Sequence, residues 1–351
     1  MKNNSKEGTI LDESNNIICH KKYYEKHQKK KKYYNIIILM ILLLIMNLIV
    51  IIKIFTQLKG LNSIYYRNIT NKSNNKEQMV LVDLYDSPLE TFDSKILANI
   101  QTQLLGYIEL TINEQRFFNG LLRKIKPKKI VEIGVSSGGS SSLILNAIKD
   151  IEGAKLYSIE KLKEAYKFKD KEAGFIVKEK FPYLMNKWNL YTGGITSEFI
   201  EKIGGEIDLV FIDTAHYTPG EMLDWLQVLP FLKEEAIVVF HDTFLMYYKS
   251  ITKKKRNFSN NLLFTYIRGE LILPSYGNSI FFRNIGALKL AKSQQNYYIQ
   301  YFMALGIQWE YMPEEEDLIK MRKLYMKYYG YKYVKIFDEA IKNNKYHLGI
   351  K

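Results

Sequence analysis

The chain has 351 residues, of which 47% are hydrophobic and 25% are charged, so it is long enough for one large globular domain with appended segments. Its net charge of +14 suggests an anionic partner, but no arginine-rich arm, zinc-ligand pattern or aromatic RNA-binding motif accompanies it. No nucleic-acid function is therefore expected. The single cysteine, Cys19, excludes an internal disulfide framework.

The first part of the chain contains three segments of different composition. Residues 1–34 hold nine lysines against four acidic residues and are expected to form a basic disordered tail. Residues 36–52 carry no charge, and residues 35–55 together have the length of roughly 20 residues that a transmembrane helix needs. Residues 56–93 are rich in Asn, Ser and Lys, as is typical of a linker. These patterns predict a protein attached to a membrane by one helix.

Helical and strand patterns alternate through residues 94–293. Capping boxes at Thr111 to Glu114 and at Thr218 to Glu221 are each expected to open a helix. Short apolar runs predict strands at residues 130–133, 156–159, 188–191, 209–212 and 237–240. The alternation predicts an α/β fold with a mostly parallel, doubly wound sheet.

The end of the chain has a different pattern. Residues 271–275, 279–282 and 284–288 are further strand candidates. Residues 294–351 are rich in Tyr and Lys with helical periodicity, and this extension is expected to form a packing or oligomer-forming cap rather than a separate domain.

A glycine loop follows the first predicted strand, where ligands of parallel sheets bind. Ser140 stands where a P-loop carries its lysine, and the loop also lacks the G-x-G-x-x-G spacing of a dinucleotide fingerprint. It does match the pattern E-x-G-x-x-x-G, through Glu132, Gly134 and Gly138. A tight strand-to-helix turn without a ligand is the alternative interpretation.

On these residues the chain resembles the class I S-adenosylmethionine (SAM) methyltransferases. In that family the acid and the loop hold the amino acid end of SAM, and the sheet ends in an antiparallel hairpin. The resemblance implies cofactor contacts at Glu132, Gly134, Ser136 and Gly138. Glu160, at the end of the second predicted strand, has the position of the acid that binds the ribose hydroxyls.

Polar residues also follow two later strands. Asp213 and His216 end one strand, and His241 and Asp242 end the next, so these side chains should open on one side of the sheet. Such a set can hold a divalent ion, with oxygen ligands favouring Mg²⁺, and a histidine there can accept a proton near neutral pH. Asp224, inside the helix between the two strands, is interpreted as a surface or packing residue.

This D-x-x-H and H-D arrangement resembles a branch of small-molecule O-methyltransferases that includes macrolide-sugar and cephalosporin-modifying enzymes. The resemblance implies His216 as general base, Asp213 and Asp242 as catalytic positioning groups, and Asp213 as a cofactor contact as well. In metal-dependent members, acids at these strand ends bind Mg²⁺. Here His241 replaces one carboxylate, so a metal held by Asp213, His241 and Asp242 is left open.

The resemblance implies a membrane-anchored, SAM-dependent O-methyltransferase that acts on a hydroxyl of a sugar, glycan or other small molecule. The alternative is a non-catalytic membrane protein whose methyltransferase-like domain binds a ligand or a partner. Lysines are more frequent before the apolar segment than after it, which favours an external catalytic domain. SAM is a cytosolic metabolite, and on that ground we expect the domain in the cytoplasm; the topology stays open.

Overall fold

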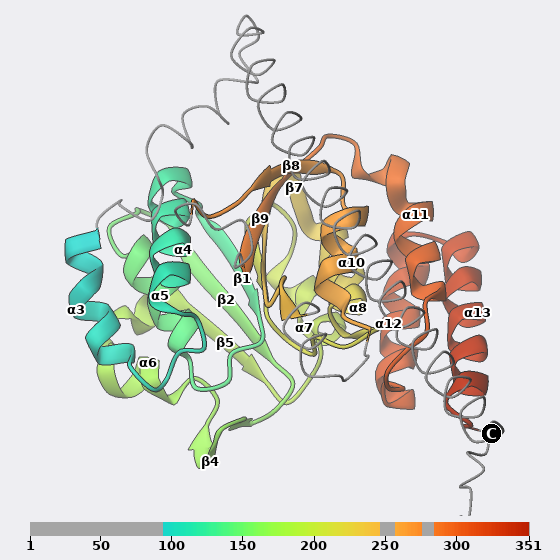
Figure 1. Cartoon of the computed structure of the whole chain (residues 1–351), viewed down its shortest axis with the longest axis horizontal. Helices are drawn as coiled ribbons and strands as arrows, with labels where there is room; N and C mark the ends of the chain where they lie inside the picture. The colour runs from blue at the N-terminus through green and yellow to red at the C-terminus, as the bar shows by residue number, and fades with distance from the viewer. Residues whose placement is uncertain (1–93, 246–256, 276–283, 351) are drawn as a thin grey trace, which may run out of the picture. The chain divides into compact units, whose positions relative to one another are not determined.

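A seven-stranded sheet forms the centre of the computed structural model, which describes residues 94–245, 257–275 and 284–350 (Figure 1). The strand order is β5-β2-β1-β6-β7-β9-β8. Five strands run parallel, β9 is antiparallel to β7, and β8 is antiparallel to β9. The predicted mostly parallel sheet with a final antiparallel hairpin is confirmed. The strands are β1 (Lys129–Ile133), β2 (Lys155–Glu160), β5 (Trp188–Thr192), β6 (Ile207–Ile212), β7 (Leu232–His241), β8 (Gly269–Ile272) and β9 (Ile285–Leu290).

Helices cover both faces of this sheet, because its central strands are apolar on both sides (Figure 1). One face packs against α3 (Ser94–Leu104), α4 (Ile112–Ile125), α5 (Gly139–Ile148) and α6 (Phe175–Lys180). The other packs against α7 (Thr196–Ile203), α8 (Gly220–Val228) and α10 (Ser259–Tyr266). Two short strands, β3 (Glu164–Ala165) and β4 (Phe168–Glu172), form a separate hairpin after β2.

The two predicted capping boxes have different outcomes. At α4 the capping box is confirmed, since Thr111 N donates to Glu114 Oε2 at 2.6 Å and Glu114 N donates to Thr111 Oγ1 at 3.4 Å. At α8 the prediction is wrong. The N-cap is Pro219, and the hydroxyl of Thr218 donates to the carbonyl of Gln308 instead. The buried Glu221 is thereby directed into the site described below.

The C-terminal extension continues the core on the α8 side of the sheet (Figure 1). The hydroxyls of Tyr325 and Tyr329 donate to carbonyls of α8 at 3.1 and 2.6 Å. At the end of β2, Lys161 pairs with Asp317 at 2.6 Å and with Glu314 at 3.1 Å. The extension therefore reaches the carboxyl edge of the sheet. Its helices are α11 (Tyr298–Met303), α12 (Glu315–Tyr328) and α13 (Tyr331–His347).

Several predictions fall outside the described residues. These are the basic tail, the apolar segment at residues 36–52, the linker and the strand candidate at residues 279–282. Within the described ranges, no helix combines the length and the apolar character that crossing a membrane requires.

Candidate active site

The glycine loop after β1 is packed against neighbouring backbone. Gly134 has φ +94°, and a Cβ atom there would lie 1.9 Å from the carbonyl oxygen of Asp213. Gly138 has φ +90°, and its Cβ would lie 2.8 Å from the Cα of Gly174. On the Cβ side of these two glycines the close approach is made by protein backbone, and the cofactor contacts that the resemblance implies for them stay a prediction. The loop and the end of β6 are thereby held together.

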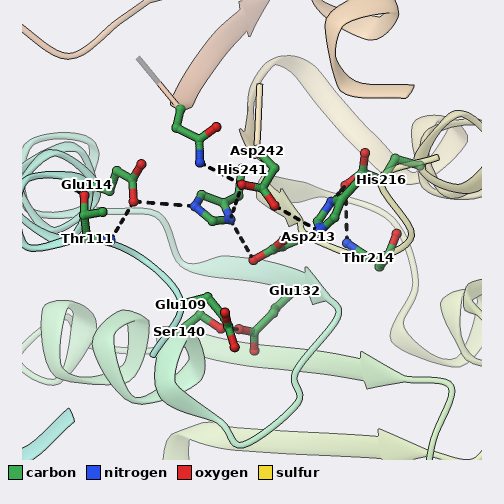
Figure 2. A network of polar contacts seen from close by, with 12 residues as sticks. Glu109, Thr111, Glu114, Glu132, Ser140, Asp213, Thr214, His216, His241 and Asp242 are labelled. Carbon is green, nitrogen blue, oxygen red and sulfur yellow. Dashed lines mark hydrogen bonds and ion pairs between the residues drawn. The ribbon is translucent and has the colours of Figure 1, made fainter. Parts of the chain in front are cut away.

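Glu132 lies beneath this loop and is fully buried (Figure 2). Its carboxylate accepts hydrogen bonds from the hydroxyls of Ser140, Ser141 and Ser158, each at 2.6 Å. Burial raises the pKa of Glu132 to about 7, although the three hydroxyls act in the opposite direction. The side chain therefore joins β1 to β2 and to the first turn of α5.

Glu160 lies directly beside the loop. Its Oε2 atom accepts hydrogen bonds from the backbone N–H groups of Val135 and Ser136, both at 2.9 Å, and Oε1 accepts one from Leu162 at 3.0 Å. Ser136 has a positive φ of 50°, so the backbone turns sharply at this residue. A carboxylate has about four acceptor positions, so Glu160 keeps capacity for a further donor such as a ribose hydroxyl.

His216 is held between two carboxylates (Figure 2). Its Nε2 atom lies 3.0 Å from Asp242 Oδ2, and its Nδ1 atom lies 3.2 Å from Glu221 Oε1. Burial lowers the pKa of His216, but the two carboxylates outweigh it and raise that pKa to about 10. The two carboxylates therefore favour the protonated imidazole, whereas a base must carry the neutral ring.

His241 lies between two other carboxylates (Figure 2). Its Nε2 atom is 3.5 Å from Glu114 Oε2, and its Nδ1 atom is 3.3 Å from Asp213 Oδ2 and 3.8 Å from Asp242 Oδ1. Burial lowers the pKa of His241, but the surrounding carboxylates raise it well above its ordinary value. The neighbouring Asp242 Oδ1 also accepts a hydrogen bond from Asn284 at 2.7 Å.

The sheet edge therefore brings together the four strand-end residues that the sequence predicted, and it adds two that the sequence analysis missed. Both Glu114 and Glu221 lie in predicted capping boxes, and no local signal distinguishes a capping glutamate from one that is also buried beside a histidine. Each of the two histidines thus lies between carboxylates, and the cluster contains four carboxylates in all. The six residues are Glu114, Asp213, His216, Glu221, His241 and Asp242.

Asp224 has the packing role that was one of its two predicted interpretations, and it is not a surface residue. The hydroxyl of Thr214 donates to its Oδ2 atom at 2.7 Å, and the hydroxyl of Thr196 lies 3.5 Å from Oδ1. Burial raises its pKa to about 6. Because Thr214 follows β6 and Thr196 begins α7, Asp224 links the ends of β5 and β6 beside the site.

Residues 131–243 match a protein-family model described as a methyltransferase domain. The chain carries a methyltransferase domain. The enzyme is a SAM-dependent methyltransferase. The match includes Glu132, the loop and all four predicted strand-end residues. No curated protein sequence matches the chain.

Solved structures of methyltransferases show distant similarity. The O-methyltransferase TomG from Streptomyces achromogenes, involved in tomaymycin synthesis and solved with SAM, is 16% identical with a TM-score of 0.40; the match covers 60% of this chain and 96% of that one. An O-methyltransferase from Bacillus cereus, solved with SAH, is 13% identical with a TM-score of 0.41, covering 60% and 97%. The methyltransferase PaMTH1 from Podospora anserina, also bound to SAH, is 14% identical with a TM-score of 0.37, covering 62% and 97%.

Proposed function

We propose that this enzyme transfers a methyl group from SAM to a hydroxyl of a sugar, glycan or other small molecule. One observation carries the proposal: the glycine loop with Glu160 and the histidine–carboxylate cluster open at the same edge of one sheet. A cofactor held at the loop and an acceptor held at the cluster would then be neighbours. Proximity of this kind supplies much of the acceleration in group transfer.

The cofactor would lie across the ends of β1 and β2. The spare acceptor capacity of Glu160 suits a ribose diol, and the first turn of α5 directs backbone N–H groups toward the loop. SAM, when bound, supplies an electrophilic methyl group on a sulfonium. Glu132 is not a direct contact in this proposal, because its carboxylate is enclosed by three serines; it shapes the loop instead.

His216 would accept the acceptor proton. In its neutral form the ring would keep a proton on Nδ1, facing Glu221, and would direct the Nε2 lone pair to the place where Asp242 now lies. An acceptor hydroxyl between Asp242 and His216 would lose its proton to Nε2 as its oxygen bonds to the methyl carbon and the sulfur–methyl bond breaks. Asp213 and Asp242 would orient that hydroxyl.

A divalent ion would bind in the part of the cluster around His241. Asp213, His241 and Asp242 each offer one ligand atom, all within 4.8 Å of one another. An ion bound by these three residues would orient the acceptor oxygen and lower the pKa of its hydroxyl. The mixed donor set suits Mg²⁺ less well than an all-oxygen set would.

The membrane attachment is a separate part of the proposal. The uncharged segment at residues 36–52 would act as a single transmembrane anchor, with the catalytic domain on the cytoplasmic side, where SAM is made. The anchor would hold the enzyme near acceptors that occur at the membrane surface.

Labelled SAM and a panel of glycans and hydroxylated small molecules test the catalytic proposal with the full-length protein. His216→Ala should lower turnover by about 100- to 10,000-fold while leaving the affinity for SAM near that of the wild type. Asp208→Asn is a matched control, because it breaks an ion pair with Lys233 at the opposite end of β6. SAM binding without transfer to any acceptor would favour the non-catalytic alternative, and full activity in His216→Ala would refute the base assignment.

A further inference from the structure

Glu114 occupies an unusual place for a helix-capping residue. A capping glutamate normally lies at the surface, yet the side chain of Glu114 faces His241 and the residue is only 3% exposed. The capping bond from Thr111 N fixes Glu114 Oε2 at 2.6 Å, and this same oxygen lies 3.5 Å from His241 Nε2 (Figure 2). The start of α4 therefore determines which group faces one nitrogen of His241.

The other nitrogen of His241 faces the strand ends. Nδ1 lies 3.3 Å from Asp213 Oδ2 and 3.8 Å from Asp242 Oδ1. Two ligand atoms that bind one ion at about 2.1 Å and at a right angle to each other are about 3 Å apart. The two distances from Nδ1 are somewhat longer than this, and all three ligand atoms lie within 4.8 Å of one another. His241 is 4% exposed, so its orientation is fixed by this packing.

We propose that Glu114 is a positioning residue that accepts a hydrogen bond from His241 Nε2–H. His241 Nδ1 then binds a divalent ion together with Asp213 and Asp242. Because this site has both nitrogen and oxygen ligands, Mn²⁺ is favoured over Mg²⁺. A histidine that binds a metal commonly donates its other N–H to a carboxylate, which fixes the tautomer and the ring orientation. Mn²⁺ accepts carboxylate ligands as Mg²⁺ does, but as a first-row transition metal it also accepts an imidazole nitrogen, whereas Mg²⁺ prefers oxygen ligands alone. The inference rests on the proposed function only in giving the ion a role, which is to orient the acceptor hydroxyl.

Metal binding to the full-length protein, measured by calorimetry and by electron paramagnetic resonance of Mn²⁺, tests this proposal without an activity assay. Wild type should bind Mn²⁺ more tightly than Mg²⁺. Glu114→Gln should weaken Mn²⁺ binding by about 10- to 100-fold, since loss of an outer carboxylate typically has that effect. Thr111→Ala is the matched control: it removes the other half of the same cap, does not remove the Glu114 carboxylate, and should leave Mn²⁺ affinity within about threefold.

A second variant keeps the test decisive if Glu114→Gln does not fold. His241→Asp gives the site three carboxylates and should shift the preference from Mn²⁺ toward Mg²⁺. The proposal is overturned if wild type binds neither ion, if it prefers Mg²⁺, or if Glu114→Gln and Thr111→Ala weaken Mn²⁺ equally. Methyl transfer that persists with a chelator would reject this inference and leave the proposed function standing. If the protein binds Mn²⁺ but has no affinity for SAM, the proposed function is rejected and this inference stands.

Discussion

Replacing Glu132 with glutamine tests whether the buried carboxyl beneath the glycine loop holds a proton in the folded state. Burial raises the pKa of Glu132 from an ordinary 4.5 to about 7, despite three serine hydroxyls that favour the charged form. The folded protein then binds this proton more tightly than the unfolded chain, so the contribution of Glu132 to stability is fully present below the lower of these two pKa values and is lost as the pH rises through the higher one. At about 1.4 kcal/mol for each pH unit between them, this carboxyl should account for a loss of about 3 kcal/mol.

Urea unfolding at about pH 5 and about pH 8 measures this loss. Glu132→Gln keeps a polar group near Ser140, Ser141 and Ser158 but cannot titrate, so its stability relative to wild type should improve by about 3 kcal/mol between the two pH values. Ser158→Ala is a useful comparison, because it removes one hydroxyl that stabilises the charge and should steepen the dependence. A constant difference between wild type and Glu132→Gln at both pH values would refute the reasoning.

Three further predictions follow from other parts of the fold. Gly134→Ala should destabilise the protein by at least about 2 kcal/mol, because the new methyl group meets the carbonyl of Asp213, and a urea midpoint equal to that of wild type would contradict this. Tyr329→Phe should lower the free energy of unfolding by about 1 kcal/mol through loss of the hydrogen bond to Leu226, while Tyr331→Phe, at an exposed position, should have little effect in the same denaturation assay. Alkaline carbonate extraction should leave the full-length protein in the membrane pellet if residues 36–52 span the bilayer, and recovery in the supernatant would exclude that anchor.

The fold was predictable because its signals are local. Five parallel strands follow from short apolar runs, and the box at Thr111 follows from a four-residue pattern. The box at Thr218 has the same pattern, but the contact that overrides it comes from Gln308, about ninety residues later in the chain. A local pattern carries no information about such a partner, which is why this prediction failed.

The site was predictable only in part for the same reason. Strand-end positions identified Asp213, His216, His241 and Asp242, because a parallel sheet brings such positions to one edge. The protonation of His216 depends on Glu221 and on how deeply both side chains are buried, and neither can be read from spacing. Sequence thus located the groups, whereas packing determined which of them carry protons.

The contact between Gly134 and Asp213 also bears on how the two halves of the site move. A Cβ atom at position 134 would lie 1.9 Å from the carbonyl oxygen of Asp213. No side chain therefore fits between the glycine loop and the end of β6. Asp213 N also donates to the carbonyl of Ile133 at 3.0 Å, so a main-chain hydrogen bond joins the two segments next to this contact. In the proposed reaction, main-chain geometry would then set the distance between the methyl group of SAM and the acceptor oxygen. If the glycine loop and the end of β6 move together, SAM and the acceptor molecule would move with them. The distance between the methyl group and the acceptor oxygen would then stay nearly constant while the surrounding protein fluctuates.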